Sequence, residues 1–282
     1  MNASKRSTFY FHADANALGG ILKQPLHRTV ATHASVSLAE AGGFSTKRTG
    51  RFNLDGLISF EAAHVVVSGS EHSEQESWRT TATASIERLN ILEVITADRI
   101  VAQISVMYPM DRGPAEISFN GTQFVNLRVN GVAVHVELDS RFSNVLAAGA
   151  EGREGESNLR QQHAPHFSDL LKAADEQYQE GAALQQRLVE KLGPRFARSN
   201  PRRDLDEKGS ALCSLVQKME AEPSVETYGH MLHAPDFGNV CFGELQLSRA
   251  SARLTMLRLE LGCIADGTLS VGTASATGYP MP

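Results

Sequence analysis

The stretch Arg79–Met107, which reads RTTATASIERLNILEVITADRIVAQISVM, decides the fold because it contains two long runs with the alternation of β-strands. The first run covers Arg79–Leu92 and the second covers Val94–Met107. In the second run every other residue is apolar, and these positions share one face of the strand: Ile100, Ala102, Ile104 and Val106. The sequence therefore predicts a long antiparallel pair with one face in the core.

Turn and strand patterns on both sides of this pair extend the β-rich region. Asn130-Gly131 separates Phe124–Val129 from Val132–Leu138, and both turn residues tolerate the positive φ that a two-residue type I′ turn requires. A hairpin is predicted there. Ile58–Ser68 is a further strand candidate, and the strand pattern returns after Pro223 in three more runs: Val240–Leu247, Arg253–Leu261 and Thr268–Ala276.

A helical segment interrupts the strands. Ser168 is a candidate N-cap and Gly193-Pro194 a stop, and a 3.6-residue apolar period connects them through Leu171, Ala174, Tyr178, Ala182, Val189 and Leu192. A second helix ending before Pro223 is predicted from Leu205, Leu212, Leu215, Val216 and Met219. The two together predict an αα-hairpin, whose apolar stripes need a surface to cover.

We expect a mainly β protein: an antiparallel β-sandwich-like core with an inserted αα-hairpin. Residues 1–140 form the N-terminal β-rich part, residues 141–222 the linker and helical hairpin insertion, and residues 223–282 the C-terminal strands that complete the β core. Two packed β-lobes joined by the hairpin are the alternative. A single sandwich is favoured because three or four C-terminal strands alone would form a thin domain.

The charge balance and the distribution of apolar residues indicate which classes of partner to expect. The 27 Lys and Arg residues nearly balance the 32 Asp and Glu residues, so we expect no nucleic-acid partner. No run of about 18 apolar residues occurs, which argues against a membrane span. The N-terminus lacks the apolar segment of a signal peptide, so a cytoplasmic location is expected, with surface association only through partners. The cysteines suit buried thiols, and a bridge between Cys241 and Cys263 is left open.

Two groups of side chains are candidate metal ligands. His230, His233 and Asp236 lie in GHMLHAPDFG, and imidazole and carboxylate are common ligands of zinc and related ions. Residues three apart on a strand face opposite ways, so the two histidines share an ion only if they lie in a turn or helix. Solvated polar residues that lead into a strand are the alternative interpretation.

The second group lies on the last strand of the predicted hairpin. His135, Glu137 and Asp139 alternate with an apolar set that includes Val136 and Leu138, so the polar set should face solvent or a cleft. There it could bind a metal or act as acid and base. An ordinary solvated strand face explains the same pattern.

The motifs of common enzyme classes are absent from the sequence. Neither a G-x-S-x-G elbow, nor a glycine-rich turn between strand and helix, nor a GK[ST] motif occurs, so no cofactor is expected and whether the chain is an enzyme is left open. The first hypothesis is a non-catalytic binding, structural or assembly protein with a protein partner or self-association through edge strands. The alternative is a metal-dependent enzyme or metal-stabilised β-fold that uses the histidine and carboxylate groups.

Thr81–Ser105, TATASIERLNILEVITADRIVAQIS, followed by FVNLRVNGVAV at Phe124–Val134, resembles bacterial β-rich proteins of the choice-of-anchor type. In those proteins a "VTAD" strand precedes an "LxVNG" hairpin. The resemblance covers about a fifth of the chain. It implies a bacterial β-sandwich with a surface-related or structural role, and it carries over no functional residue.

Overall fold

Strands dominate the computed structural model, which describes residues 8–24, 27–111, 113–142, 166–192, 210–221, 226–248, 251–262 and 265–280. Within these ranges the chain forms strands β1 to β20, the helix α1 (Phe167–Leu192) and a short 3-10 turn, η1 (Ser73–Gln75). The predicted mainly β class is confirmed. None of the helical residues in these ranges forms a segment long and apolar enough to cross a membrane.

One sheet, called sheet A, joins the first strands of the chain to the last. Its order is β16-β17-β18-β19-β20-β1-β2, and β14 pairs with β18 beside β17. Neighbouring strands are antiparallel. The bounds are β1 Phe9–Gln24, β2 Arg28–Ser37, β14 Ala211–Ser214, β16 Glu226–Tyr228, β17 Met231–Ala234, β18 Gly238–Ser248, β19 Ser251–Gly262 and β20 Asp266–Pro280.

Sheet B comes from the first half of the chain and centres on the antiparallel pair of β7 and β8. Its strands are β3 Gly43–Thr49, β4 Phe52–Leu54, β5 Ile58–Phe60, β6 Ala62–His72, β7 Ser77–Ile91, β8 Ile95–Pro109, β9 Glu116–Ser118, β10 Gln123–Val125, β11 Arg128–Val129 and β12 Val132–Ala133. A separate two-stranded sheet pairs β13 (His135–Leu138) with β15 (Val216–Glu220). The predicted long pair is confirmed.

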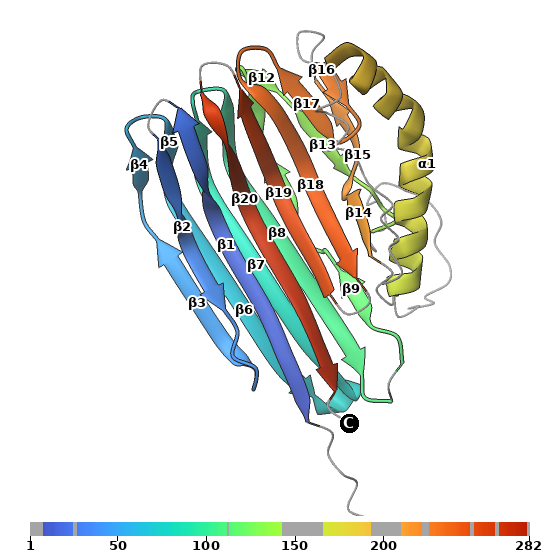
Figure 1. Cartoon of the computed structure of the whole chain (residues 1–282). Helices are drawn as coiled ribbons and strands as arrows, with labels where there is room; N and C mark the ends of the chain where they lie inside the picture. Colours follow the sequence, from blue (N-terminus) through green and yellow to red (C-terminus); the bar gives the residue numbers. More distant parts are fainter. Residues whose placement is uncertain are drawn as a thin grey trace, which may run out of the picture.

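Sheets A and B lie face to face, and the core fills the space between them (Figure 1). The apolar set predicted on β8 is buried, with Ile100 and Ile104 completely shielded from water. At one end of the core the ring of Phe9 stacks on Trp78, with 4.8 Å between the ring centroids. The arrangement is sandwich-like.

The predicted Asn130-Gly131 turn is confirmed. It joins β11 to β12, and both residues have the positive φ of a type I′ turn, 51° and 77°. The strand that follows leaves the hairpin, because β13 pairs with β15 rather than with β11. The predicted first helix is also present, although it begins at Phe167, one residue before the predicted cap Ser168.

The αα-hairpin is a wrong prediction, because the second segment forms strands. Residues Ala211–Ser214 and Val216–Glu220 are β14 and β15, which pair with β18 and β13; Leu205 lies outside the described residues. The hydroxyl of Ser214 donates to the carbonyl of Phe242 and accepts from the N–H of Val216, which fixes a non-helical backbone. Pairing with distant strands outweighs the local apolar period.

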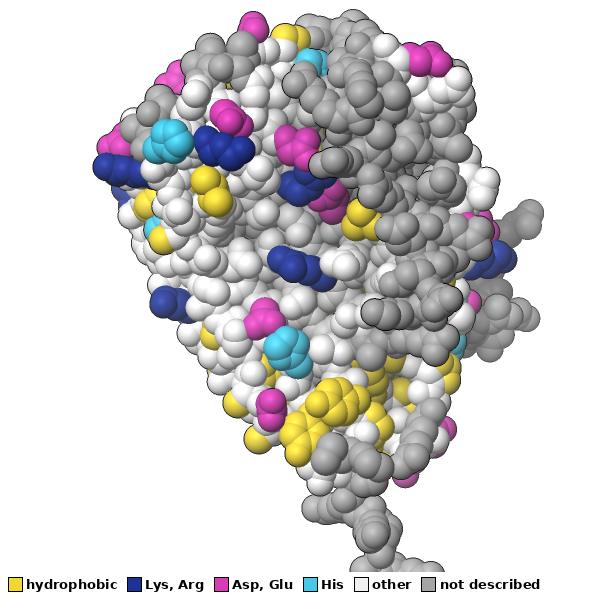
Figure 2. Space-filling model, viewed as in Figure 1, with side chains coloured by type: hydrophobic (Ala, Val, Ile, Leu, Met, Phe, Trp, Pro, Cys, Tyr) yellow, Lys and Arg dark blue, Asp and Glu magenta, His cyan; other side chains and the backbone are white. Residues whose placement is uncertain are grey.

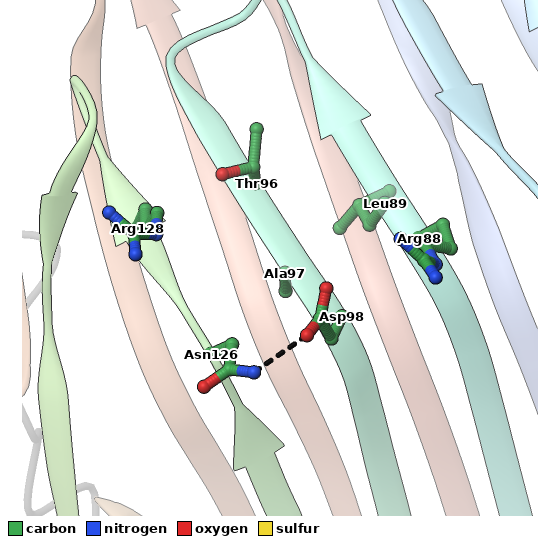
Figure 3. Close-up of a pocket in the computed structure, with 7 residues that line it drawn as sticks. All are labelled: Arg88, Leu89, Thr96, Ala97, Asp98, Asn126 and Arg128. Carbon is green, nitrogen blue, oxygen red and sulfur yellow. Dashed lines mark hydrogen bonds between the residues drawn. The ribbon is translucent and has the colours of Figure 1, made fainter.

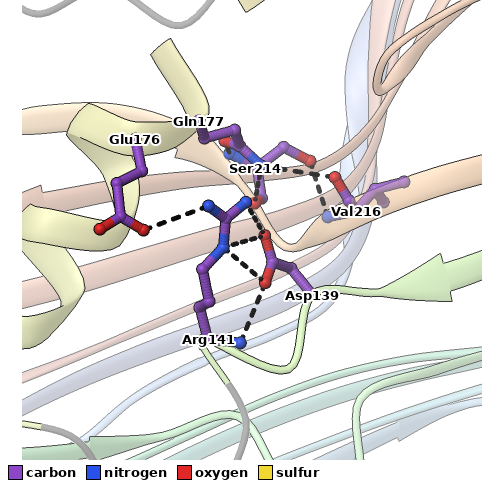
Figure 4. A network of polar contacts seen from close by, with 6 residues as sticks. All are labelled: Asp139, Arg141, Glu176, Gln177, Ser214 and Val216. Atoms are coloured by element: carbon purple, nitrogen blue, oxygen red, sulfur yellow. Dashed lines mark hydrogen bonds and ion pairs between the residues drawn. The ribbon is translucent and has the colours of Figure 1, made fainter. Parts of the chain in front are cut away.

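Helix α1 packs on this strand segment through Leu170, Ala173 and Ala174, which are buried against the core. Figure 4 shows the polar contacts beside it, where Arg141 connects the buried carboxylate of Asp139 to Glu176 on the helix. The Arg141 guanidinium donates to both oxygens of Asp139, with distances of 2.7–3.0 Å. The helix is therefore attached by apolar and polar contacts together.

Candidate functional site

A depression with a volume of about 420 Å³ lies on the outer face of sheet B (Figure 3). Arg88 and Leu89 reach it from β7, and the chain near β10 and β11 supplies Asn126 and Arg128. Thr96, Ala97 and Asp98 line it from β8. The two arginines and Asp98 are exposed, whereas Leu89 and Ala97 are buried beneath them. The depression thus has a polar rim over an apolar floor.

On both β7 and β8 the alternation of buried and exposed side chains reverses at these polar groups. On β7 the buried positions change from even to odd numbers between Ile86 and Leu89, and Arg88 between them has a φ of 53°. The left-handed residue rotates the strand, so that two consecutive side chains face solvent. On β8 the buried positions change from odd to even numbers across Asp98 and Arg99, and the two reversals lie opposite each other in the pairing.

Hydrogen bonds fix part of this rim. Asn126 Nδ2 donates to Asp98 Oδ2 at 2.6 Å, and Asn126 adopts a φ of 50° where the chain passes from β10 to β11. The Arg128 guanidinium donates to the carbonyl of Gly131 at 3.1 Å. The side chains of Asp98 and Arg128 therefore each have a hydrogen-bond partner within the protein.

A second depression of about 560 Å³ adjoins the first and shares Arg88 with it. Its lining combines charged, amide, hydroxyl and aromatic groups: Arg51, Phe52, Asn53, Ser59, Phe60, Glu61 and Arg88. The Phe52 ring is half-buried and packs on Phe60 at a centroid distance of 5.2 Å. We call the two depressions together the arginine groove.

The groove is locally positive on a negative chain. Arg51, Arg88 and Arg128 contribute three positive charges and Glu61 and Asp98 two negative ones, so the lining carries a net +1, against −5 for the whole chain. The Arg88 Nε lies 3.6 Å from Glu61 Oε2, in a pair that is more than two-thirds exposed and therefore weak. Arg88 stays available to an anion.

The outer face of sheet A has a different character. In the coloured part of that face in Figure 2, most of the surface is neutral and charged side chains are scattered. Near one end, Tyr10 and Tyr279 stack with 5.7 Å between their ring centroids, and Tyr279 is 55% exposed. The side chains suited to an extended polar ligand gather instead on sheet B.

The structure separates the predicted metal ligands His135, Glu137 and Asp139. His135 and Glu137 are exposed on β13, where they align with Glu220 and Lys218 of β15. Asp139 is buried and bound to Arg141. These side chains therefore do not converge within the described part of the chain.

The predicted group of His230, His233 and Asp236 is also divided. His230 is buried in the turn between β16 and β17, whereas Asp236 is exposed with a φ of 61° in the turn between β17 and β18. The Nδ1 atom of His233 lies 2.9 Å from Asn239 Oδ1. Neither His233 nor Asp236 belongs to the group that His230 joins.

His230 instead meets Cys241 and Glu244, and one ligand atom of each lies within 4.8 Å of the others. Among the described residues this is the group of three metal-binding side chains that converges. Burial raises the pKa of the Cys241 thiol, and the nearby Glu244 carboxylate raises it further. Arg258 contacts the same group, with Nη2 3.2 Å from the sulfur of Cys241.

Sequence reasoning missed this group because Cys241 and Glu244 are three residues apart on one strand. In a regular strand they would face opposite ways. Gly243 between them has a φ of 58°, and the core residues of β18 change there from even numbers, Val240 and Phe242, to odd numbers, Leu245 and Leu247. Both side chains therefore lie on the same face of β18, away from the core between the sheets, and a glycine inside a strand pattern was the available signal.

A family model for a domain of unknown function, DUF8256, matches residues 9–248. The chain belongs to this family. No curated protein and no solved structure matches the chain. In this DUF8256 protein the matched region runs from β1 to β18, so it contains the whole arginine groove together with His230, Cys241 and Glu244, whereas Arg258 lies after it.

Proposed function

We propose that this DUF8256 protein is a non-catalytic binding protein that holds an acidic oligosaccharide in the arginine groove. The observation that carries the proposal is the presence of three arginines in the lining of two adjoining depressions, with Arg88 shared by both. Guanidinium groups bind carboxylates through paired hydrogen bonds and keep their charge at every physiological pH. A ligand with repeated carboxylates can contact arginines in both depressions.

The other side chains of the groove suit sugar hydroxyls. Asn53, Ser59 and Thr96 offer neutral donors and acceptors, and the half-buried Phe52 adds apolar surface to the lining. The groove is also divided into two parts on an outer sheet face, which fits an extended chain better than one enclosed metabolite.

Calorimetric titration with galacturonate oligomers tests this function, with galactose oligomers of equal length as the neutral comparison. Binding of the acidic oligomer alone is expected, and Arg88→Ala should weaken it at least about tenfold, since a charge-assisted hydrogen bond contributes about 1.5–3 kcal/mol. Arg253→Ala is the matched control, because Arg253 is an exposed arginine on β19 of the opposite sheet. Equal affinity for the neutral oligomer, or no binding of either, would overturn the proposal.

A second candidate function is self-assembly, which the edge of sheet B favours. Within the described residues β3 is hydrogen-bonded along one side, to β6, and its Phe44 is 69% exposed. An open strand edge with an exposed aromatic ring is a surface on which a second copy of the chain can pair. Light scattering after gel filtration tests this: Phe44→Ser should reduce the apparent mass, and a strict monomer at all micromolar concentrations would remove the candidate.

A further inference from the structure

The group formed by His230, Cys241 and Glu244 has the chemistry of a zinc site. Imidazole nitrogen, thiolate sulfur and carboxylate oxygen are the three ligand types that zinc uses in proteins. The three ligand atoms lie within 4.8 Å of one another. Cys241 is fully shielded from water, and His230 is 8% exposed.

The fold holds these ligands on a hydrogen-bonded frame. The turn that carries His230 is tied to β18, because the N–H of Phe242 donates to the His230 carbonyl at 2.9 Å. Gly243 lies where β18 exchanges one neighbour, β17, for another, β14. Its left-handed backbone brings Glu244 to the same face as Cys241. Ligands fixed in this way lose little conformational entropy when an ion binds.

The guanidinium group of Arg258 already places a positive charge beside Cys241 and Glu244. Arg258 donates to both carboxylate oxygens of Glu244, through Nε at 2.6 Å and Nη2 at 2.7 Å, and it also contacts the Cys241 sulfur. Its remaining nitrogen, Nη1, donates to Glu260. If Glu244 turned to a metal ion, Arg258 would keep Glu260 as a carboxylate partner, so the exchange would leave no buried positive charge unpaired.

We propose that His230, Cys241 and Glu244 bind one zinc ion, and that Arg258 and zinc compete for Glu244. When zinc binds, the S–H bond of Cys241 breaks, a zinc–sulfur bond forms, and the proton passes to the buffer. Three protein ligands leave a fourth coordination position for water, which is the ligand number of catalytic zinc sites.

Metal titration of the full chain tests the site. After treatment with a chelator, the protein is titrated with zinc and, separately, with cobalt(II), whose bond to a thiolate produces a near-ultraviolet charge-transfer band. We expect one equivalent of zinc, a rise in melting temperature and the cobalt band. His230→Gln and Cys241→Ser should each weaken zinc binding at least about tenfold, in line with the loss of a ligand.

Two control variants separate this site from other thiols and histidines. Cys213→Ser changes another buried cysteine and His233→Gln changes a histidine outside the group, so both should bind zinc as the wild type does. A circular dichroism melt of every variant checks folding. If Cys241→Ser does not fold, His230→Gln and the cobalt spectrum of the wild-type protein decide the question.

Arg258→Gln distinguishes a zinc site from a permanent ion pair. Removal of the competing guanidinium should tighten zinc binding at least about tenfold. A tenfold change corresponds to about 1.4 kcal/mol, which is less than the free energy that a charged hydrogen bond contributes. An ion pair without metal function predicts no zinc binding by either protein. The absence of the cobalt band in both, or equal zinc affinity in His230→Gln and wild type, would overturn the proposal.

Discussion

The side-chain amide of Gln177 on α1 forms a matched pair of hydrogen bonds with the backbone of Ser214 on β14. Its Nε2 donates to the Ser214 carbonyl at 2.9 Å, and its Oε1 accepts from the Ser214 N–H at 2.8 Å (Figure 4). The amide thereby does for β14 what a neighbouring strand would do. The helix and the strand are coupled through this pair.

Gln177→Leu should therefore destabilise the protein by about 1–3 kcal/mol, because it leaves a buried N–H and a buried carbonyl unpaired. Urea unfolding followed by circular dichroism measures the change. Gln186→Leu is the control, since the Gln186 amide contacts Glu190 on the exposed side of the same helix. Equal stability of the two variants would show that the amide pair contributes nothing to helix attachment.

Leu215→Asp tests whether the segment after the helix belongs to the core. Leu215 is 2% exposed between β14 and β15, and its N–H donates to the Gly243 carbonyl at 2.8 Å. A buried carboxylate without a partner should cost about 3–5 kcal/mol, visible as a lower melting temperature. Gln217→Asp, two residues on and exposed, should change stability by less than about 0.5 kcal/mol. Loss of association at an unchanged melting temperature would show instead that the segment docks on a partner.

The sequence predicts the fold where one local signal determines the structure. The two-residue alternation of Arg79–Met107 fits β-strands and no helix, and Asn130-Gly131 fits one type of turn. The apolar spacing of Leu212, Leu215, Val216 and Met219 fits both a helix and two short strands. The segment forms strands because it pairs with β18, which lies later in the chain, and with β13, which lies before the helix. No local sequence pattern reveals that pairing.

The same dependence on pairing that no local pattern reveals explains why the sequence does not predict the two candidate sites. Arg51, Arg88 and Arg128 come from three separate segments of sheet B, and the sequence shows none of them as neighbours. The sequence offers His230 as a candidate ligand beside His233 and Asp236, which are close to it in sequence. Its actual neighbours, Cys241 and Glu244, depend on a backbone reversal at one glycine. Local departures from regular strand geometry create both sites.

Gly243→Ala tests the importance of that reversal. The backbone φ of 58° costs an L-residue about 1–2 kcal/mol, and an added Cβ would lie 3.2 Å from Val216 Cγ2. Chemical denaturation should show a loss of at least this size, and zinc affinity should fall as Glu244 moves away. Gly50→Ala is the control, because nothing lies within 4 Å of its added Cβ. An unchanged zinc affinity would separate the backbone conformation at Gly243 from the metal site.

Tyr108 should make the protein sensitive to alkaline pH. Burial raises the pKa of its phenol from 10.0 to about 12, and hydrogen bonds to the Thr277 side chain and the Gly278 backbone offset part of the rise. Between these two values the unfolded chain loses the phenolic proton and the folded chain retains it, so deprotonation favours unfolding. The stabilisation that the protonated Tyr108 phenol gives the folded chain is complete below about pH 10 and disappears as the pH rises to about 12.

Tyr108→Phe should remove this contribution, which amounts to about 2–3 kcal/mol for a shift of this size. Urea unfolding at a series of pH values from about 9 to 12 measures the effect: the wild-type protein should lose more stability over that range than Tyr108→Phe. Tyr279→Phe removes the same hydroxyl from an exposed ring at the end of β20 and should retain the wild-type slope. Identical slopes for all three proteins would show that Tyr108 ionises equally easily in the folded and unfolded chains, which its burial between the two sheets argues against.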